Sequence, residues 1–128
     1  MIKKTHIILY VADQERSTEF YRKLFEVEPI LHVPGMTEFQ LSDGCVMGLM
    51  PEAGIKRLLG DPLPDPTQAN GIPRCELYLV VDDAEAYHRR ALALGAKELS
   101  PLLPRDWGDR VAYSLDADGN VIAFAGKG

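Results

Sequence analysis

The chain has 128 residues, of which 46% are hydrophobic, and a formal net charge of −5. This length suits one domain, residues 1–128, with enough chain to bury a core without disulfides or metal ions. Acidic residues outnumber basic ones, so we do not expect the basic surface that nucleic acids and anionic membranes bind, and we expect neither partner.

The first half of the chain predicts a strand, a helix and three further strands. His6–Val11 is short and rich in strand-forming residues, and Asp13 follows it as a helix cap. We expect Pro29 to stop that helix, because proline cannot continue one. The three later strands are expected at Glu28–Val33, Met36–Leu41 and Cys45–Met50.

Residues 51–74 form the connection to the second half and hold five of the nine prolines. A short helix is possible at Ala53–Leu59. Because so long a connection in a compact domain is usually functional or mobile, two interpretations stay open. The segment is either a plain linker, or a flap over a pocket or an arm that reaches a partner subunit.

The second half repeats the order of the first. A strand is expected at Glu76–Val81, a helix after Asp83, and a helix end at Gly95. Asp118-Gly119 matches Asp43-Gly44 as a tight hairpin turn. The remaining strands are expected near Lys97–Leu103, Arg110–Leu115 and Asn120–Ala125. Residues 1–50 and 75–128 therefore predict two copies of one β-α-β-β-β module.

This repeat resembles the vicinal oxygen chelate superfamily, which includes glyoxalase I, extradiol dioxygenases and bleomycin resistance proteins. The resemblance lies in the repeated order, in the first strand leading into Glu19-Phe20-Tyr21, and in the closing run from Asp116 to Ile122. It implies an α+β fold whose two βαβββ modules form curved mixed sheets around a cavity. It also implies a homodimer, in which modules pair either within one chain or between two.

In that superfamily, metal ligands lie on the first and fourth strands of each module. Mapped by motif, the positions in this chain are His6, Gly48, Glu76 and Ala123. Glycine and alanine cannot bind a metal, whereas catalytic sites generally need about three protein ligands. The resemblance therefore implies at most an incomplete metal set, His6 and Glu76.

Two other carboxylates, Glu38 and Glu52, could in principle add a third ligand, but we interpret both as solvated groups. We expect no cofactor. The alternative is a divalent metal such as Zn²⁺, Ni²⁺, Mn²⁺ or Fe²⁺.

The function that we expect is binding of a small organic ligand, with sequestration of an apolar or aromatic drug or metabolite. Small residues at the ligand positions would leave room, and aromatic residues would line it. The expected ligand-binding residues are Tyr10, Gly48, Met50, Glu76, Tyr78, Trp107 and Ala123. The alternative is a glyoxalase-like lyase or isomerase, or a dioxygenase-like enzyme, that uses His6 and Glu76. Glu76 is also the candidate general base of a metal-free enzyme.

The remaining polar motifs predict structural roles. Cys45 and Cys75 form no CxxC motif, so we expect reduced thiols in a cytoplasmic protein. His32 and His88 are expected on the surface. The acidic run that begins at Asp116 is expected to be a turn rather than a calcium loop, because a terminal glutamate is missing.

Overall fold

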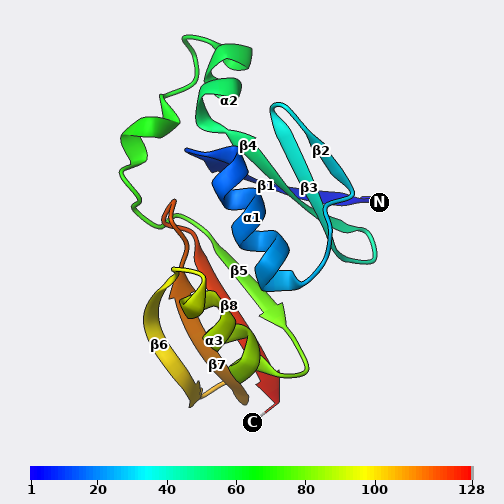
Figure 1. The fold of residues 1–128 in the computed structure, drawn as a ribbon, viewed down its shortest axis with the longest axis vertical. Helices are drawn as coiled ribbons and strands as arrows, with labels where there is room; N and C mark the ends of the chain where they lie inside the picture. The colour runs from blue at the N-terminus through cyan, green and yellow to red at the C-terminus, as the bar shows by residue number, and fades with distance from the viewer. Residues whose placement is uncertain (128) are drawn as a thin grey trace. The chain divides into compact units, whose positions relative to one another are not determined.

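A computed structural model describes residues 1–127 and divides the chain into two compact units, Met1–Ala69 and a second that starts at Asn70. Each unit contains one four-stranded mixed sheet with a helix packed on one face (Figure 1). The predicted α+β class and the duplicated βαβββ order are therefore confirmed.

The first unit begins with β1 (Thr5–Val11) and α1 (Gln14–Phe25), followed by three more strands. These are β2 (Leu31–Val33), β3 (Met36–Ser42) and β4 (Cys45–Pro51). The strand order is β1-β4-β3-β2, with β1 parallel to β4 and the other pairs antiparallel. β1 and β4 therefore lie side by side although a helix and two strands separate them in sequence.

Helix α1 begins where the sequence predicts and ends earlier. The Asp13 side chain accepts a hydrogen bond from the backbone N–H of Arg16, as an N-cap does. The helix ends at Phe25, and Glu26 takes the left-handed conformation (φ 55°), so Pro29 is not what stops it. β2 is shorter than predicted, and it is an edge strand paired only with β3.

The core of the first unit lies between α1 and the sheet. Phe39 on β3 is fully buried, and its ring meets Phe25 edge-on with centroids 6.2 Å apart. Leu24 of the helix and Leu49 of β4 are also fully buried. Apolar burial on this face holds the helix to the strands.

The segment between the modules is partly helical. It contains α2 (Glu52–Leu59), as predicted to within one residue, and a short 3-10 helix at Pro66–Ala69. Ile55 is buried, whereas Leu58 and Leu59 are exposed.

The second unit repeats this plan with β5 (Glu76–Val80), α3 (Ala84–Ala93) and three more strands. These are β6 (Lys97–Pro104), β7 (Asp109–Leu115) and β8 (Val121–Lys127), in the order β5-β8-β7-β6. Asp83 caps α3 by accepting from the backbone N–H of Ala86. Phe124 of β8 is fully buried and stacks with Tyr87 of α3 at 5.1 Å between centroids.

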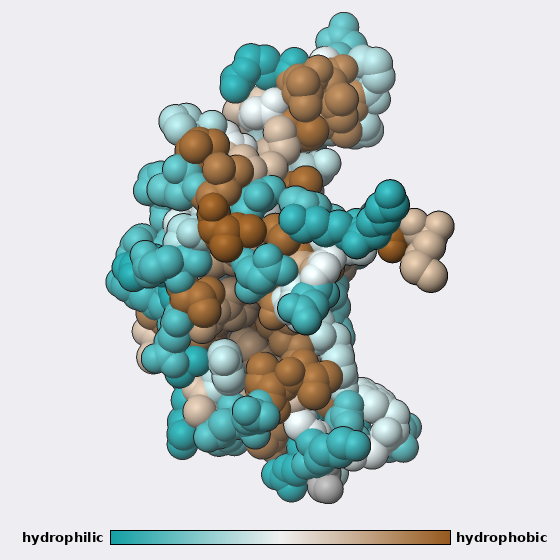
Figure 2. All heavy atoms as spheres, turned by 90° about the vertical axis from the view of Figure 1, so that its right-hand side faces the viewer, coloured by the Kyte–Doolittle hydropathy of each residue, from teal (hydrophilic) through white to brown (hydrophobic). Residues whose placement is uncertain are grey.

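The face of each sheet opposite its helix exposes large side chains. Ile8 and Tyr10 are exposed on β1, whereas Leu9 and Val11 between them are buried. The molecular surface carries several apolar patches among hydrophilic ones (Figure 2). Among residues 1–127 we find no helix with the length and apolar character needed to cross a bilayer.

Candidate functional site

The open face of the first sheet collects the residues that the sequence places at the ligand positions. Parallel pairing sets Ile8 beside Gly48 and Tyr10 beside Met50, and Cα partners project to the same face. His6 lies on that face too, two residues before Ile8. The structure thus groups His6, Tyr10, Gly48 and Met50 on one surface of the first unit.

His6 on this face contacts a residue whose role the sequence did not reveal. Its Nδ1 lies 3.3 Å from Oε2 of Glu38, with side chains 36% and 20% exposed. Because β4 lies between β1 and β3, the two side chains meet across β4. Glu38 is therefore a partner of His6 rather than a solvated carboxylate.

A register shift places Glu38 on this side of the sheet. Ser42 pairs with Cys45, but one extra residue intervenes before the next pair, and Glu38 then lies opposite Gly48. With regular pairing from Ser42 onward, Glu38 would lie opposite Leu49 and face α1. By taking up the extra residue outside the ladder, the bulge keeps the Glu38 carboxylate on the face of His6.

The room left by Gly48 is already occupied. A Cβ atom built there would lie 3.1 Å from Sδ of Met36 and 3.2 Å from Cγ1 of Ile8. A side chain at position 48 would therefore displace these neighbours. Position 48 therefore offers no metal-binding side chain, and the side chains of Met36 and Ile8 fill the space above it.

Ala123 has the corresponding position in the second sheet and is also covered. It pairs with Tyr78 of β5 on one side and with Tyr113 of β7 on the other, and it is 0% exposed. Tyr113 packs against the buried cluster of Val111, Ala123 and Ala125.

The Tyr78 hydroxyl connects two other residues of the second unit. It donates to Oδ2 of Asp109 at 2.5 Å and accepts from Nε1–H of Trp107 at 3.0 Å. Since β8 separates β5 from β7, the Tyr78 side chain crosses β8, where Ala123 and Ala125 are small. The hydrogen bond to Asp109 is the main reason why the pKa of Tyr78 is raised, while the bond from Trp107 opposes it.

Next to this group, Arg105 lies over an aromatic ring. Its guanidinium carbon is 5.1 Å from the centroid of Tyr113, and Nη2 donates to Ser100 Oγ and to the Val111 carbonyl. Its Nε is buried and has no hydrogen-bond partner among residues 1–127. One basic group therefore accompanies the acidic and aromatic groups of the second unit.

The four positions that the resemblance assigns to metal ligands supply two donor side chains, one in each unit. His6 belongs to the first unit, where it contacts Glu38, and Glu76 is an exposed residue of the second. Gly48 and Ala123 offer no donor atom. No group of three His, Cys, Asp or Glu side chains that could hold a metal ion occurs within the described range.

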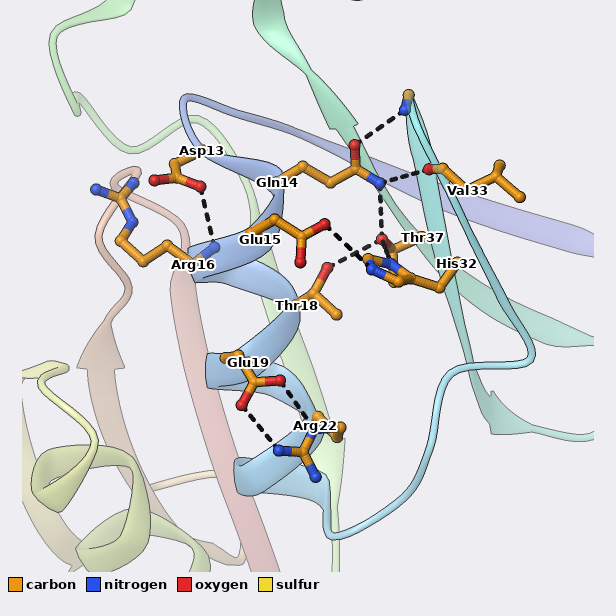
Figure 3. A network of polar contacts seen from close by, with 11 residues as sticks. Asp13, Gln14, Glu15, Arg16, Thr18, Glu19, Arg22, His32, Val33 and Thr37 are labelled. Carbon is orange, nitrogen blue, oxygen red and sulfur yellow. Dashed lines mark hydrogen bonds and ion pairs between the residues drawn. The ribbon is translucent and has the colours of Figure 1, made fainter.

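A separate polar network joins α1 to the turn between β2 and β3 (Figure 3). Nε2 of Gln14 donates to the Val33 carbonyl and to Oγ1 of Thr37. Thr37 is fully buried and also contacts Thr18 Oγ1 at 2.9 Å and His32 Nδ1 at 2.8 Å. A surface hollow of about 540 Å³ lies beside the network, lined by Ala12–Glu15, His32–Pro34 and Pro51.

Two further sequence predictions concern His88 and the acidic run that begins at Asp116. His88 is buried, at 2% exposed, and Nε2 lies 2.9 Å from Glu98, so its expected surface position is wrong. Ala84, His88 and Ala91 recur at i, i+4 and i+7, and this spacing could have revealed the buried face. The Asp116 carboxylate accepts from Asp118 N and from Asn120 N and Nδ2, which confirms the turn.

The fold and these open sheet faces define an α+β protein of paired βαβββ modules. Residues 4–124 match the family model of the Glyoxalase/Bleomycin resistance protein/Dioxygenase superfamily. The chain belongs to this superfamily, as the sequence resemblance implied.

Similar proteins agree with this assignment. An uncharacterized protein of Mycobacterium bovis is 30% identical over 121 residues, which cover 88% of this chain and 75% of that protein. The crystal structure of a glyoxalase-related enzyme from Fulvimarina pelagi has a TM-score of 0.83 at 21% identity, covering 99% of this chain and 89% of that one. A glyoxalase/bleomycin resistance protein/dioxygenase family enzyme from Burkholderia phytofirmans has a TM-score of 0.76 at 19% identity, covering 95% and 96%. At these identities, the structural matches establish the fold.

Proposed function

We propose that this protein binds a small apolar or aromatic molecule on the open faces of its sheets, without a catalytic metal. The observation that carries the proposal is the group formed by Trp107, Tyr78 and Asp109 in the second unit. The covered positions Gly48 and Ala123 support the metal-free form.

Trp107 is the ligand-contacting residue in this proposal. Its indole is held by the hydrogen bond to Tyr78, yet the residue is 56% exposed. A ring that is both tethered and exposed offers a flat surface for stacking at a low cost in side-chain entropy. Asp109 and Glu76 add negative charge, which favours a ligand with a cationic group.

The test is a titration of the fluorescence of Trp107, the single tryptophan, with a panel of planar aromatic compounds, both neutral and cationic. We expect saturable quenching by some members, and weaker binding by Tyr78→Phe because the indole loses its tether. Tyr87→Phe, on the helix side of the same sheet, is the matched control and should bind like the wild type. If no compound changes the fluorescence, or if both variants behave alike, the proposal fails.

The assembly and its location belong to the same proposal. We infer a cytoplasmic homodimer, since the superfamily resemblance implies paired modules and neither cysteine forms a disulfide within residues 1–127. Elemental analysis of protein purified without chelator tests the metal-free form. Near-stoichiometric metal that is lost in His6→Ala and Glu76→Ala would favour the lyase or isomerase alternative.

A further inference from the structure

The imidazole of His6 has one nitrogen beside a carboxylate and the other available. Nδ1 lies 3.3 Å from Glu38, and no hydrogen bond joins Nε2 to any group within residues 1–127. The His6 side chain is 36% exposed and lies on the open face of the first sheet.

The other two histidines differ from His6 in this respect. His32 has partners at both nitrogens, with Thr37 at Nδ1 and Glu15 3.1 Å from Nε2. The His88 side chain is 3% exposed. Only His6 among the three combines a carboxylate at Nδ1, a partly exposed side chain and an Nε2 with no hydrogen bond to residues 1–127.

A carboxylate beside one nitrogen of a neutral imidazole favours the tautomer that carries the proton on that nitrogen. An ionised carboxylate only accepts hydrogen bonds, so its contact with Nδ1 is favourable when Nδ1 bears hydrogen. A neutral imidazole then presents a lone pair at Nε2.

The surroundings of the pair select the chemistry of a ligand. Ile8 and Met36 fill the space over Gly48, so the neighbouring surface is apolar. Glu38 disfavours an anionic ligand through like-charge repulsion. A lone pair on an apolar surface requires a ligand that donates a hydrogen bond and is otherwise apolar.

We propose that Glu38 is a positioning residue that holds the proton on Nδ1 of His6. Nε2 then accepts a hydrogen bond from the hydroxyl or N–H group of a small, otherwise apolar molecule. The second part rests on the proposed small-molecule binding, whereas the role of Glu38 stands on the first unit alone.

The tautomer is tested by long-range proton–nitrogen correlation spectra of ¹⁵N-histidine protein, purified with chelator, at a pH where the imidazoles are neutral. We expect the Nδ1–H tautomer for His6, assigned with His6→Asn. In Glu38→Leu this tautomer should give way to Nε2–H, while Glu38→Gln, whose amide oxygen still accepts, should keep it. An Nε2–H tautomer in the wild type, or an unchanged one in Glu38→Leu, would overturn the role of Glu38.

A matched control uses the other carboxylate that faces an exposed histidine. Glu15→Leu removes the partner of His32 Nε2 and should leave the His6 resonances unchanged. A change of the His6 tautomer in this variant would contradict the proposal, because it would show that the tautomer does not depend specifically on Glu38.

The ligand is tested with phenol and with anisole, in which a methyl group replaces the hydroxyl hydrogen, so that only phenol can donate a hydrogen bond. Phenol should shift the His6 Nε2 resonance and bind about fivefold more tightly than anisole, the factor expected of one neutral hydrogen bond. Equal binding of the two, or no shift, overturns the acceptor role. If Trp107 fluorescence in the same samples responds to aromatic compounds, small-molecule binding survives that failure. A His6 resonance that responds instead to stoichiometric Zn²⁺ would assign Nε2 to a metal.

Discussion

The protonation of Tyr78 depends on one hydrogen bond. Because the Asp109 carboxylate accepts a hydrogen bond from the Tyr78 hydroxyl, the pKa of Tyr78 lies above the ordinary value of about 10. The stabilisation from this proton is complete below the unfolded pKa and is lost as the pH rises through the folded one.

We therefore expect Asp109→Asn to lower the pKa of Tyr78 towards the ordinary tyrosine value. The measurement is tyrosinate absorbance during an alkaline titration, with the Tyr78→Phe curve subtracted to isolate this residue. Asp106→Asn, which changes a carboxylate in the loop just before β7, should leave the curve unchanged. Superimposable curves for wild type and Asp109→Asn would contradict the assignment.

The buried hydroxyl of Thr37 is expected to contribute to the stability of the first unit. Its buried hydroxyl meets Gln14, Thr18 and His32, so Thr37→Val leaves their polar atoms without this partner. We expect a loss of about 1–3 kcal/mol in the free energy of unfolding, measured by urea denaturation. Thr37→Ser keeps the hydroxyl and should lose less; a larger loss in Thr37→Ser than in Thr37→Val would refute this.

At the scale of elements, the two equivalent hairpins place different demands on their glycines. Gly44 and Gly119 both have positive φ, 72° and 88°. A Cβ at Gly44 meets open space, whereas one at Gly119 would collide with the backbone carbonyl of Gly71. Gly44→Ala should therefore cost only the left-handed backbone strain, about 1–2 kcal/mol.

Gly119→Ala should cost more than Gly44→Ala, because the Gly71 segment must also move. Circular dichroism during chemical denaturation compares the two variants directly. Equal losses in unfolding free energy would mean that the contact between the hairpin and Gly71 adds no constraint.

Local sequence signals predicted the elements, because caps and tight turns depend on few residues. Asp13 and Asp83 cap their helices, and the Asp-Gly pairs form hairpins. The partnership of His6 with Glu38 was not predictable, because it depends on β3 accommodating one extra residue as a bulge rather than within the ladder. Side-chain direction in a strand reverses with a shift of one residue, and no local signal fixes that shift.

The aromatic group of the second unit was predicted in part for a similar reason. The sequence indicates Tyr78 and Trp107 as ligand-contacting candidates, but not Asp109, which accepts a hydrogen bond from Tyr78. Its contact with Tyr78 spans 31 residues of sequence and requires the strand order β5-β8-β7. Pairings of this kind follow from topology rather than from local sequence pattern.

At the scale of the whole molecule, the exposed sheet faces bear on the proposed dimer. Val80 is 73% exposed on β5, and burying such apolar surface favours association. We expect sedimentation at twice the chain mass of 14.2 kDa, and weaker association in Val80→Lys. Val27→Lys, 42% exposed in the loop after α1, is the control and should leave association unchanged. A monomer at all concentrations would exclude the dimer.

Because of the bulge in β3, the hairpin of β3 and β4 contains one residue that has no partner in the ladder of paired residues. If that residue, Leu41, were deleted, Ser42 could still pair with Cys45, and Gln40 with Val46. Every residue from Met36 to Gln40 would then keep its face, and Glu38 would still reach His6. We therefore expect deletion of Leu41 to leave the His6–Glu38 contact in place. The hairpin of β3 and β4 should thus tolerate the loss of one residue.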